Sequence, residues 1–330
     1  MNKYIFYPGC SIEGSAKAYY DSLNAIKDEL GMSLQEIDDW NCCGATEYFG
    51  INLIPAYSLI ARNLALAASQ GKDTNTMMAP CSACYLNLEK ADYYMAERPS
   101  LGIKVNEALA AGGLHYDPGS IQIRHLLDVI INDIGLDAVK SKVSRPLTGL
   151  RVAPYLGCMV PRPDYQHRWS DFEHPSELDD VLKVLGAEVV DFPLKTNCCG
   201  GHMTQIGPET AYELIRRLVS SAEEQKADIM VTVCPMCQMN LDAYQNETNR
   251  YFNTNFKMPI VFFTQLIALA FGKTAKEAGF GMELTSVKDA LERIGMETPA
   301  PIAKTAKKPE GLPMPIRKQK KYASGLKASE

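Results

Sequence analysis

Asn41-Cys42-Cys43-Gly44 and Asn197-Cys198-Cys199-Gly200 are two copies of one tetrapeptide, and the cysteines around them are spaced alike in both copies. A lone cysteine precedes each tetrapeptide and a Cys-x-x-Cys pair follows it. The flanking cysteines are Cys10, Cys81 and Cys84 in the first copy and Cys158, Cys234 and Cys237 in the second. All ten cysteines of the chain belong to this pattern, which has the spacing of ligands to a metal cluster.

The residues next to the cysteines are repeated as well. Tyr7-Pro8-Gly9-Cys10 corresponds to Tyr155-Leu156-Gly157-Cys158, and an Asn-Leu pair follows both Cys-x-x-Cys motifs, at Asn87 and Asn240. A chain of 330 residues is long enough for about two domains. We therefore infer an internal duplication, with domains at residues 1–146 and 147–275 and a C-terminal extension at 276–330.

Each half alternates apolar runs with amphipathic segments, which predicts an α/β fold with parallel strands. The pattern predicts strands at 4–7, 76–79, 152–156 and 229–233, and helices at 15–30, 55–70, 176–185 and 208–225. Helical segments are also expected at 121–131 and 263–270. Gly31 and Gly186 follow equivalent helices in the position that favours a left-handed C-terminal cap.

The cysteines lie in the loops that follow the predicted strands. In parallel sheets such loops collect at the carboxyl edge, so we expect the five cysteines of each half to converge. Five thiolates exceed the four ligands of structural zinc and the four of an ordinary cubane cluster. The adjacent pair Cys42-Cys43 favours a centre with several metal positions, with Gly44 and Gly200 allowing a tight turn beside it. A scaffold with two structural zinc sites is the weaker alternative.

Charge and hydropathy restrict the class of protein further. The N-terminus has no signal-peptide pattern, and the apolar run 259–272 is too short to span a bilayer, so we expect a cytoplasmic chain without membrane insertion. Residues 301–330 contain eight Lys or Arg and two Glu, which gives them a charge of +6. Because the whole chain has a net charge of −5, the remaining 300 residues carry −11. We expect a flexible basic tail, with docking on an acidic partner as the alternative and no nucleic-acid binding.

The doubled motif resembles the CCG-domain proteins, specifically the B subunit of heterodisulfide reductase, over roughly residues 1–275. The resemblance implies two tandem Rossmann-like domains related by pseudo-twofold symmetry, each binding a noncubane [4Fe-4S] cluster. It implies a catalytic oxidoreductase subunit that reduces a disulfide, or oxidises thiols in reverse, with one electron from each of two facing clusters. The implied ligands are Cys10, Cys42, Cys43, Cys81 and Cys84 for one cluster, and Cys158, Cys198, Cys199, Cys234 and Cys237 for the other.

The chain has no ferredoxin, flavin or nicotinamide motif, so electrons must come from another subunit. In the family that donor is a ferredoxin-like C subunit, itself supplied by a flavin-containing A subunit or a membrane partner. Arg162 is a candidate contact for an anionic substrate, or caps a domain interface. His202 could donate a proton or bond a cluster sulfide, or serve a structural role. An electron-transfer subunit of a quinone- or thiol-linked complex, without its own disulfide site, is the alternative function.

Overall fold

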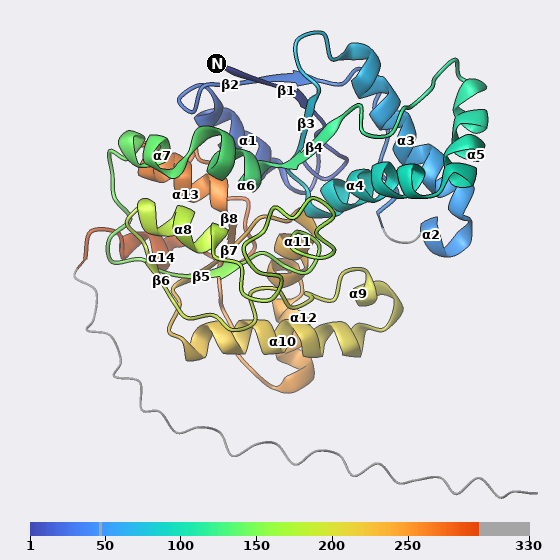
Figure 1. Ribbon diagram of the computed structural model, residues 1–330. Coiled ribbons are helices and arrows are strands. Elements are labelled where there is room, and N and C mark those ends of the chain that lie inside the picture. Colours follow the sequence, from blue (N-terminus) through green and yellow to red (C-terminus); the bar gives the residue numbers. More distant parts are fainter. Residues whose placement is uncertain (46–47, 297–330) are drawn as a thin grey trace, which may run out of the picture. The chain divides into compact units, whose positions relative to one another are not determined.

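The computed structural model describes residues 1–45 and 48–296, and all of these belong to one compact unit (Figure 1). Two parallel sheets of four strands each organise this unit, with strand orders β2-β1-β3-β4 and β6-β5-β7-β8. The order is the same in both halves of the chain. The predicted α/β class and the internal repeat are therefore confirmed.

Helices and strands alternate along the first half. Its elements are β1 (Asn2–Phe6), α1 (Lys17–Lys27), β2 (Met32–Glu36), α2 (Tyr48–Ile51), α3 (Leu53–Gln70), β3 (Thr76–Ala79), α4 (Ser82–Glu97), α5 (Pro99–Ala110), β4 (Gln122–His125), α6 (Leu126–Asp128), the π-helix η1 (Val129–Ile134) and α7 (Leu136–Lys142). The long helix α3 begins where the Asn52 side chain accepts a hydrogen bond from the Ile54 N–H, which satisfies one free donor of the first turn.

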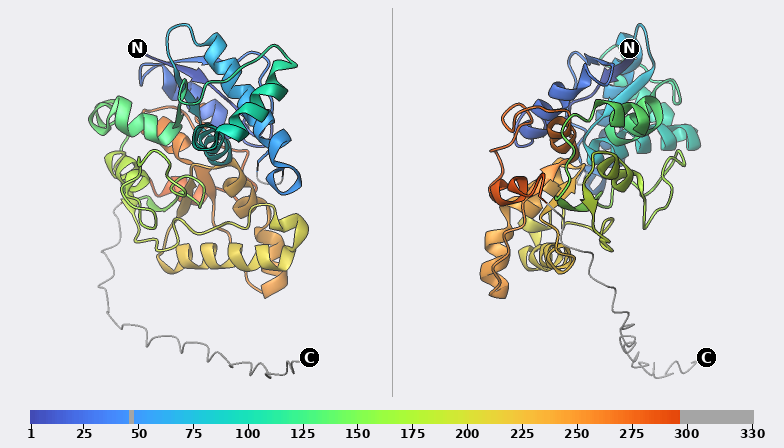
Figure 2. Two further views of the ribbon diagram at one scale, coloured as in Figure 1. Left: turned by 45° about the vertical axis from the view of Figure 1, so that its right-hand side comes forward. Right: turned by 90° about the vertical axis from the view of Figure 1, so that its left-hand side faces the viewer.

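The second half repeats this order with shorter connections at its end. Its elements are β5 (Arg151–Tyr155), α8 (Glu177–Val184), β6 (Glu188–Val189), α9 (Met203–Ile206), α10 (Pro208–Glu224), β7 (Ile229–Thr232), α11 (Pro235–Ala243), α12 (Gln245–Phe252), β8 (Ile260–Phe262), α13 (Phe263–Ala270) and α14 (Lys288–Glu292). Figure 2 shows most of the blue and cyan elements of the first half above the yellow and orange elements of the second, with orange segments of the second half reaching the blue elements.

Alternation of side chains along the strands divides the interior into three apolar clusters. In β1, Tyr4 and Phe6 point into a core that both halves share, whereas Ile5 points into a core of the first half alone. In β7, Val231 joins the shared core and Met230 joins a core of the second half. Each sheet therefore has one face on the shared core and the other on its own core.

Helices from opposite halves close the shared core. Helix α1 packs against α13 of the second half, and α8 packs against α6 and α7 of the first. The Tyr19 ring stacks on Phe262 with centroids 4.4 Å apart, and the Ser22 and Thr264 hydroxyl oxygens lie 2.6 Å apart. The reciprocal exchange of helices is what pseudo-twofold symmetry between the halves produces.

One predicted element is wrong. Residues 121–131 do not form a single helical segment, because residues 122–125 are strand β4, paired with β3 from Thr76 to Ala79. Ile121 and Ile123 are buried and alternate with the exposed Gln122, and a short run of this kind is compatible with either structure until its pairing is known. The counterpart of this strand, β8, also precedes its helix directly.

The part of the extension that the structure describes packs on the body of the protein. Ala278 and Ala290 are buried in the shared core, and the Gly279 backbone lies close to the Ala18 carbonyl of α1. The basic tail predicted at 301–330 lies outside the described residues. Among the residues that are described, no helix combines the length and apolar character needed to cross a bilayer.

Candidate cofactor site formed by the ten cysteines

The cysteines are placed by the carboxyl ends of the strands. Cys81 and Cys234 immediately precede α4 and α11, in the turns that leave β3 and β7. The lone cysteines lie in the loops after β1 and β5, and the Cys-Cys-Gly loops follow β2 and β6. The convergence expected of a parallel sheet therefore occurs in each half.

The five thiols of each half form a continuous array with one order of neighbours. In the first half Cys10 neighbours Cys42 at 3.7 Å between sulfurs, Cys42 neighbours Cys43, Cys43 neighbours Cys84 at 3.4 Å, and Cys84 neighbours Cys81. The second half has the same order, Cys158, Cys198, Cys199, Cys237 and Cys234. We call these the first and second thiol arrays.

Both arrays have an exposed end and a buried end. Cys10, Cys42 and Cys198 are exposed and Cys158 is half-buried, whereas both cysteines of each Cys-x-x-Cys motif are buried. Hydrogen bonding to Cys10 holds the pKa of Cys42 far below its ordinary value, and Cys158 does the same for Cys198. A metal binds thiolate rather than thiol, so both arrays offer an ionised ligand near their accessible ends.

Glycines shape the loops as the sequence predicts. Gly44 and Gly200 have φ angles of +75° and +99°, which L side chains rarely adopt. Gly9 and Gly157 also have positive φ, and a Cβ on them would lie 2.8 Å from the Cys84 sulfur and 3.0 Å from the Cys237 sulfur. Gly9 and Gly157, which precede the lone cysteines, therefore leave room for the sulfurs of Cys84 and Cys237.

Two further pairs of equivalent residues hold the Cys-Cys-Gly loops, and sequence reasoning did not assign them a role. The Tyr7 and Tyr155 hydroxyls donate to the carbonyl oxygens of the asparagines that begin the two tetrapeptides, each at 2.7 Å. The Asn87 side chain donates to the Cys43 carbonyl, and Asn240 donates to the Gly201 carbonyl at 2.7 Å. The sequence did carry a signal for these residues. In both halves the tyrosine stands three residues before the lone cysteine, and the asparagine three residues after the Cys-x-x-Cys motif.

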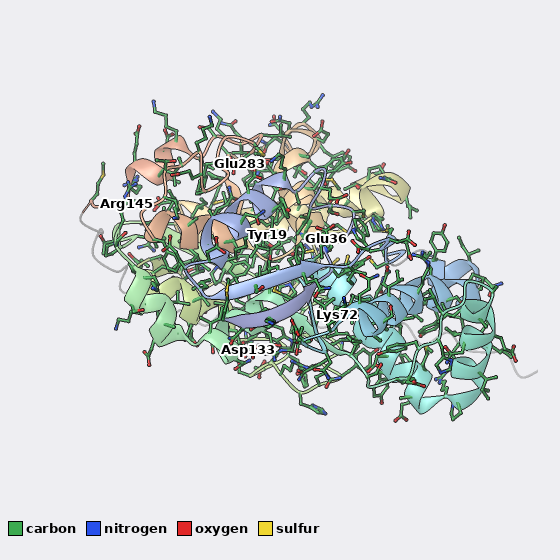
Figure 3. The ribbon with its side chains drawn as sticks, turned by 90° about the horizontal axis from the view of Figure 1, so that it is seen from above. Tyr19, Glu36, Lys72, Asp133, Arg145 and Glu283 are labelled. Carbon is green, nitrogen blue, oxygen red and sulfur yellow. The ribbon has the colours of Figure 1, made fainter. Side chains whose placement is uncertain are left out.

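The buried ends of the two arrays approach each other in the interior, where Cys81 and Cys234 both lie within electrostatic reach of Tyr19. The Ser82 hydroxyl, next to Cys81 in the chain, lies close to Cys234 of the other half. The Tyr19 hydroxyl donates to the Val233 carbonyl at 3.4 Å, and burial between Cys81 and Cys234 raises the pKa of Tyr19 well above its usual range. Figure 3 labels Tyr19 on α1, where that helix lies beside the orange elements of the second half.

His125 lies at the same junction. Its Nδ1 accepts a hydrogen bond from the Leu127 N–H, and its ring lies near the carbonyl oxygens of Pro80 and Val233, the residues just before Cys81 and Cys234. Complete burial lowers the pKa of His125 to about 4, so the ring is neutral at physiological pH.

The other predicted site residues lie beside the second array. Arg162 is exposed, and its Nη2 donates to the Thr196 carbonyl at 2.5 Å, two residues before Cys198. His202 is half-buried at the start of α9, and its carbonyl accepts from the Gln205 N–H at 3.0 Å.

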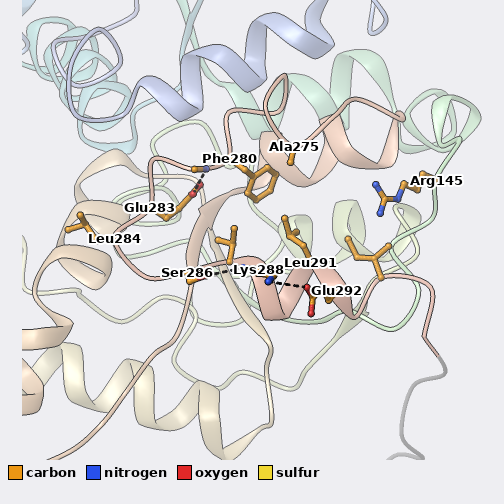
Figure 4. Close-up of a pocket in the computed structure, with 12 residues that line it drawn as sticks. Arg145, Ala275, Phe280, Glu283, Leu284, Ser286, Lys288, Leu291 and Glu292 are labelled. Atoms are coloured by element: carbon orange, nitrogen blue, oxygen red, sulfur yellow. Dashed lines mark hydrogen bonds and ion pairs between the residues drawn. The ribbon is translucent and has the colours of Figure 1, made fainter.

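The thiol arrays fit a cluster of several metals better than a single ion. Within 1–45 and 48–296, no three His, Cys, Asp or Glu side chains converge closely enough to hold one metal ion. A cavity of about 810 Å³ is lined by Arg145 and by residues between 275 and 294, and none of its lining residues is a cysteine (Figure 4). Five thiols in each array are more ligands than one tetrahedral metal ion takes, so the arrays suit an iron–sulfur centre.

A parallel α/β repeat with two thiol arrays of this kind is suited to an iron–sulfur redox subunit. The profile of the cysteine-rich CCG domain family matches residues 4–89 and again residues 152–242. The chain belongs to this family.

Curated relatives align over most of the chain. It is 33% identical to an 8-methylmenaquinol:fumarate reductase membrane anchor subunit of Wolinella succinogenes, over 84% of this chain and 95% of that protein. A protein of Archaeoglobus profundus, named as similar to the B subunit of heterodisulfide reductase, is 30% identical over 89% of this chain and 98% of that protein. The B subunit of a ferredoxin:CoB-CoM heterodisulfide reductase of Methanosarcina mazei is 25% identical, over 89% and 97%.

A solved structure shares the fold. The crystal structure of a hypothetical protein from Helicobacter pylori superposes with a TM-score of 0.66 at 14% identity, covering 86% of this chain and 52% of that one.

Proposed function

We propose that this chain is the catalytic subunit of a heterodisulfide reductase-like complex, which reduces a small-molecule disulfide or oxidises thiols in the reverse direction. The observation that carries the proposal is the approach of two equivalent five-thiol arrays at their buried ends, where Ser82, next to Cys81, lies close to Cys234. Cleaving a disulfide takes two electrons, and two equivalent one-electron sites side by side suit that stoichiometry. We place each array in its own domain, at residues 1–146 and 147–275.

Each array would hold a noncubane [4Fe-4S] cluster, with its five cysteines as ligands. Such clusters supply one-electron transfer and iron positions that accept soft sulfur ligands. The protein itself fixes the ligands: Tyr7 and Asn87 hold one Cys-Cys-Gly loop, and Tyr155 and Asn240 hold the other. Gly44 and Gly200 turn the chain immediately after the adjacent cysteines.

Residues at the rim of the second array are suited to bind the substrate. Arg162 is exposed and anchored by one nitrogen to the Thr196 carbonyl, which leaves its other donors for an anionic group next to Cys198. His202 lies three residues after Cys199 and can contact a cluster sulfide or a leaving thiolate. A disulfide with a carboxylate, sulfonate or phosphate group is the substrate class that this rim favours.

Other subunits would supply the electrons. The chain contains no flavin, nicotinamide or ferredoxin motif, and the relative from Methanosarcina mazei is part of a reductase whose name includes ferredoxin. A ferredoxin-like C subunit, itself served by a flavin-containing A subunit or an equivalent donor, is the partner arrangement we propose. The complex would work in the cytoplasm.

The relative with 33% identity favours a second candidate. That protein is named as part of a quinol-linked fumarate reductase, and the same two arrays could pass electrons to or from a quinone-linked partner without binding a disulfide. The two candidates differ in whether a thiol reaches the metal centre.

The deciding experiment is anaerobic purification, with iron, sulfide and zinc measured, followed by EPR after mild oxidation with and without a thiol. About eight irons per chain and a signal that depends on the thiol support disulfide chemistry at two clusters. Eight irons with a signal indifferent to thiol, together with oxidation by a quinone analogue, support the second candidate. Stoichiometric zinc with four irons or fewer overturns both.

A further inference from the structure

Three buried polar side chains lie along one face of α4, beginning at the cysteines. Ser82, Tyr85 and Glu89 are spaced by three and four residues, so they lie on the same side of the helix. Their exposed fractions are 1%, 0% and 1%. The Ser82 and Tyr85 hydroxyls and both Glu89 carboxyl oxygens have no partner at normal hydrogen-bond geometry among the described residues.

More unpartnered polar atoms face this helix from other elements. They are His125 Nε2 at the end of β4, and Asp164 Oδ1, Arg168 Nε and Trp169 Nε1 in the loop between β5 and α8. Buried polar groups in proteins are nearly always hydrogen-bonded, to protein or to ordered water. So many unpartnered groups in one place therefore indicate a polar path that water completes.

The path leads from Glu89 to the junction of the thiol arrays. The Glu89 carboxyl faces the Tyr85 hydroxyl, and the Tyr85 ring meets the His125 ring edge-on with centroids 5.6 Å apart. His125 lies against the carbonyls that precede Cys81 and Cys234, and Ser82 lies close to Cys234 itself. Hydroxyl groups can accept a proton and pass one on, whereas the His125 ring is held at Nδ1 by the Leu127 N–H and only borders the path.

Burial raises the pKa of Glu89 to about 8, so the carboxyl carries a proton at neutral pH. The groups that face it have opposing effects: Tyr85 and Arg168 lower its pKa, and Asp164 and Asp128 raise it. Tyr165 also lies within electrostatic reach. Arg168 binds Asp128 through Nη1 at 3.0 Å, which leaves its Nε available to a Glu89 carboxylate once the proton has left.

We propose that Glu89 is the internal proton donor for the chemistry at the junction of the thiol arrays, acting through the Tyr85 and Ser82 hydroxyls and the water between them. The inference rests on the proposed function. Reduction of one disulfide breaks the S–S bond and consumes two electrons from the external iron–sulfur reductant and two protons. Glu89 supplies one proton to a departing thiolate and becomes a carboxylate beside Arg168, and solvent supplies the second proton and restores Glu89.

The test compares Glu89→Gln with Glu107→Gln in the purified holoprotein, because Glu107 is an exposed glutamate on α5 of the same half. For Glu89→Gln we expect kcat for disulfide reduction to fall about 100-fold, with KM and iron content unchanged, since a lost acid catalyst typically costs that much. Wild-type activity should fall as pH rises through about 8, and the variant should lose that step. Glu89→Asp should restore part of kcat.

Infrared difference titration supplies a readout that does not need turnover. The carboxylic acid C=O band should disappear with a midpoint near pH 8 in wild type and in Glu107→Gln, and should be missing in Glu89→Gln. If Glu89→Gln keeps the wild-type carboxylic acid band, the inference about Glu89 is overturned. The same holds if wild type reduces a disulfide and Glu89→Gln has the same kcat and pH profile. Either result leaves the proposed function standing. If wild type reduces no disulfide, the proposed function fails, and the infrared titration still decides whether Glu89 holds a proton.

Discussion

Replacing Gly9 with alanine should damage the first thiol array and leave the second intact. Gly9 has a φ of +71°, and a left-handed backbone costs an L residue about 1–2 kcal/mol. The added Cβ would also lie 2.8 Å from the Cys84 sulfur, a contact that forces a shift in a buried ligand. Overpacking of this kind typically costs about 1–3 kcal/mol, which brings the expected loss of stability to about 2–5 kcal/mol.

The matched control is Gly113→Ala. Gly113 has nearly the same φ, +70°, but nothing lies within 4 Å of the position of its Cβ, so it incurs the backbone cost alone. Urea denaturation of the two variants separates the steric part of the loss from the backbone part. Iron analysis should show about half of the wild-type iron in Gly9→Ala and full iron in Gly113→Ala. Equal stability of the two variants, or full iron in both, would refute the role of Gly9 as the space beside the Cys84 sulfur.

Three other substitutions test separate parts of the site. Asn240→Leu removes the side chain that holds the loop of Cys199, and we expect iron loss confined to the second half, measured as about half of the wild-type iron with a circular dichroism spectrum like that of wild type. Tyr19→Ala removes a buried ring between the halves and should cost about 3–5 kcal/mol in urea denaturation; a loss under about 1 kcal/mol would contradict that packing. Asp128→Asn removes the buried carboxylate that pairs with both Arg124 and Arg168, and should cost about 3 kcal/mol at pH 7, although Arg124 keeps Asp133. Burial opposes the ionised form of Asp128, but hydrogen bonding to Arg124 outweighs it and holds the pKa of Asp128 below 3.8. The Asp128 carboxylate therefore stabilises the fold above that pH, and this contribution is lost on acidification. The difference in the free energy of unfolding between wild type and Asp128→Asn should shrink below about pH 4.

The repeated cysteines were enough to predict the fold class and the grouping of the thiols. Strands at 76–79 and 229–233 were located from short apolar runs that end at a Cys-x-x-Cys motif, and both are present. The strand at Gln122–His125 was missed, because a run of four residues with Ile123 as its one aliphatic member carries no period that separates strand from helix. Pairing with β3 decides its structure, and that is a tertiary effect.

The candidate site was only partly predictable for the same reason. The sequence shows that Cys81 and Cys234 occupy equivalent positions, but not that both lie near Tyr19, since that depends on the packing of α1 against α13 between the halves. The sequence does not predict a special role for Glu89, because a glutamate on a helix is usually exposed. Its importance comes from burial and from the loop after Cys158, which lies distant in sequence.

The exchange of helices across the shared core has a consequence for the origin of this chain. One half alone would leave part of the shared core exposed, so an ancestor with a single copy could bury that surface by pairing with an identical molecule. Such a symmetric dimer would already bring two metal centres together at its axis. A fused chain does not need identical sides, and here the connection from β5 to α8 is longer than that from β1 to α1, so only the second half carries the long loop that contains Arg162.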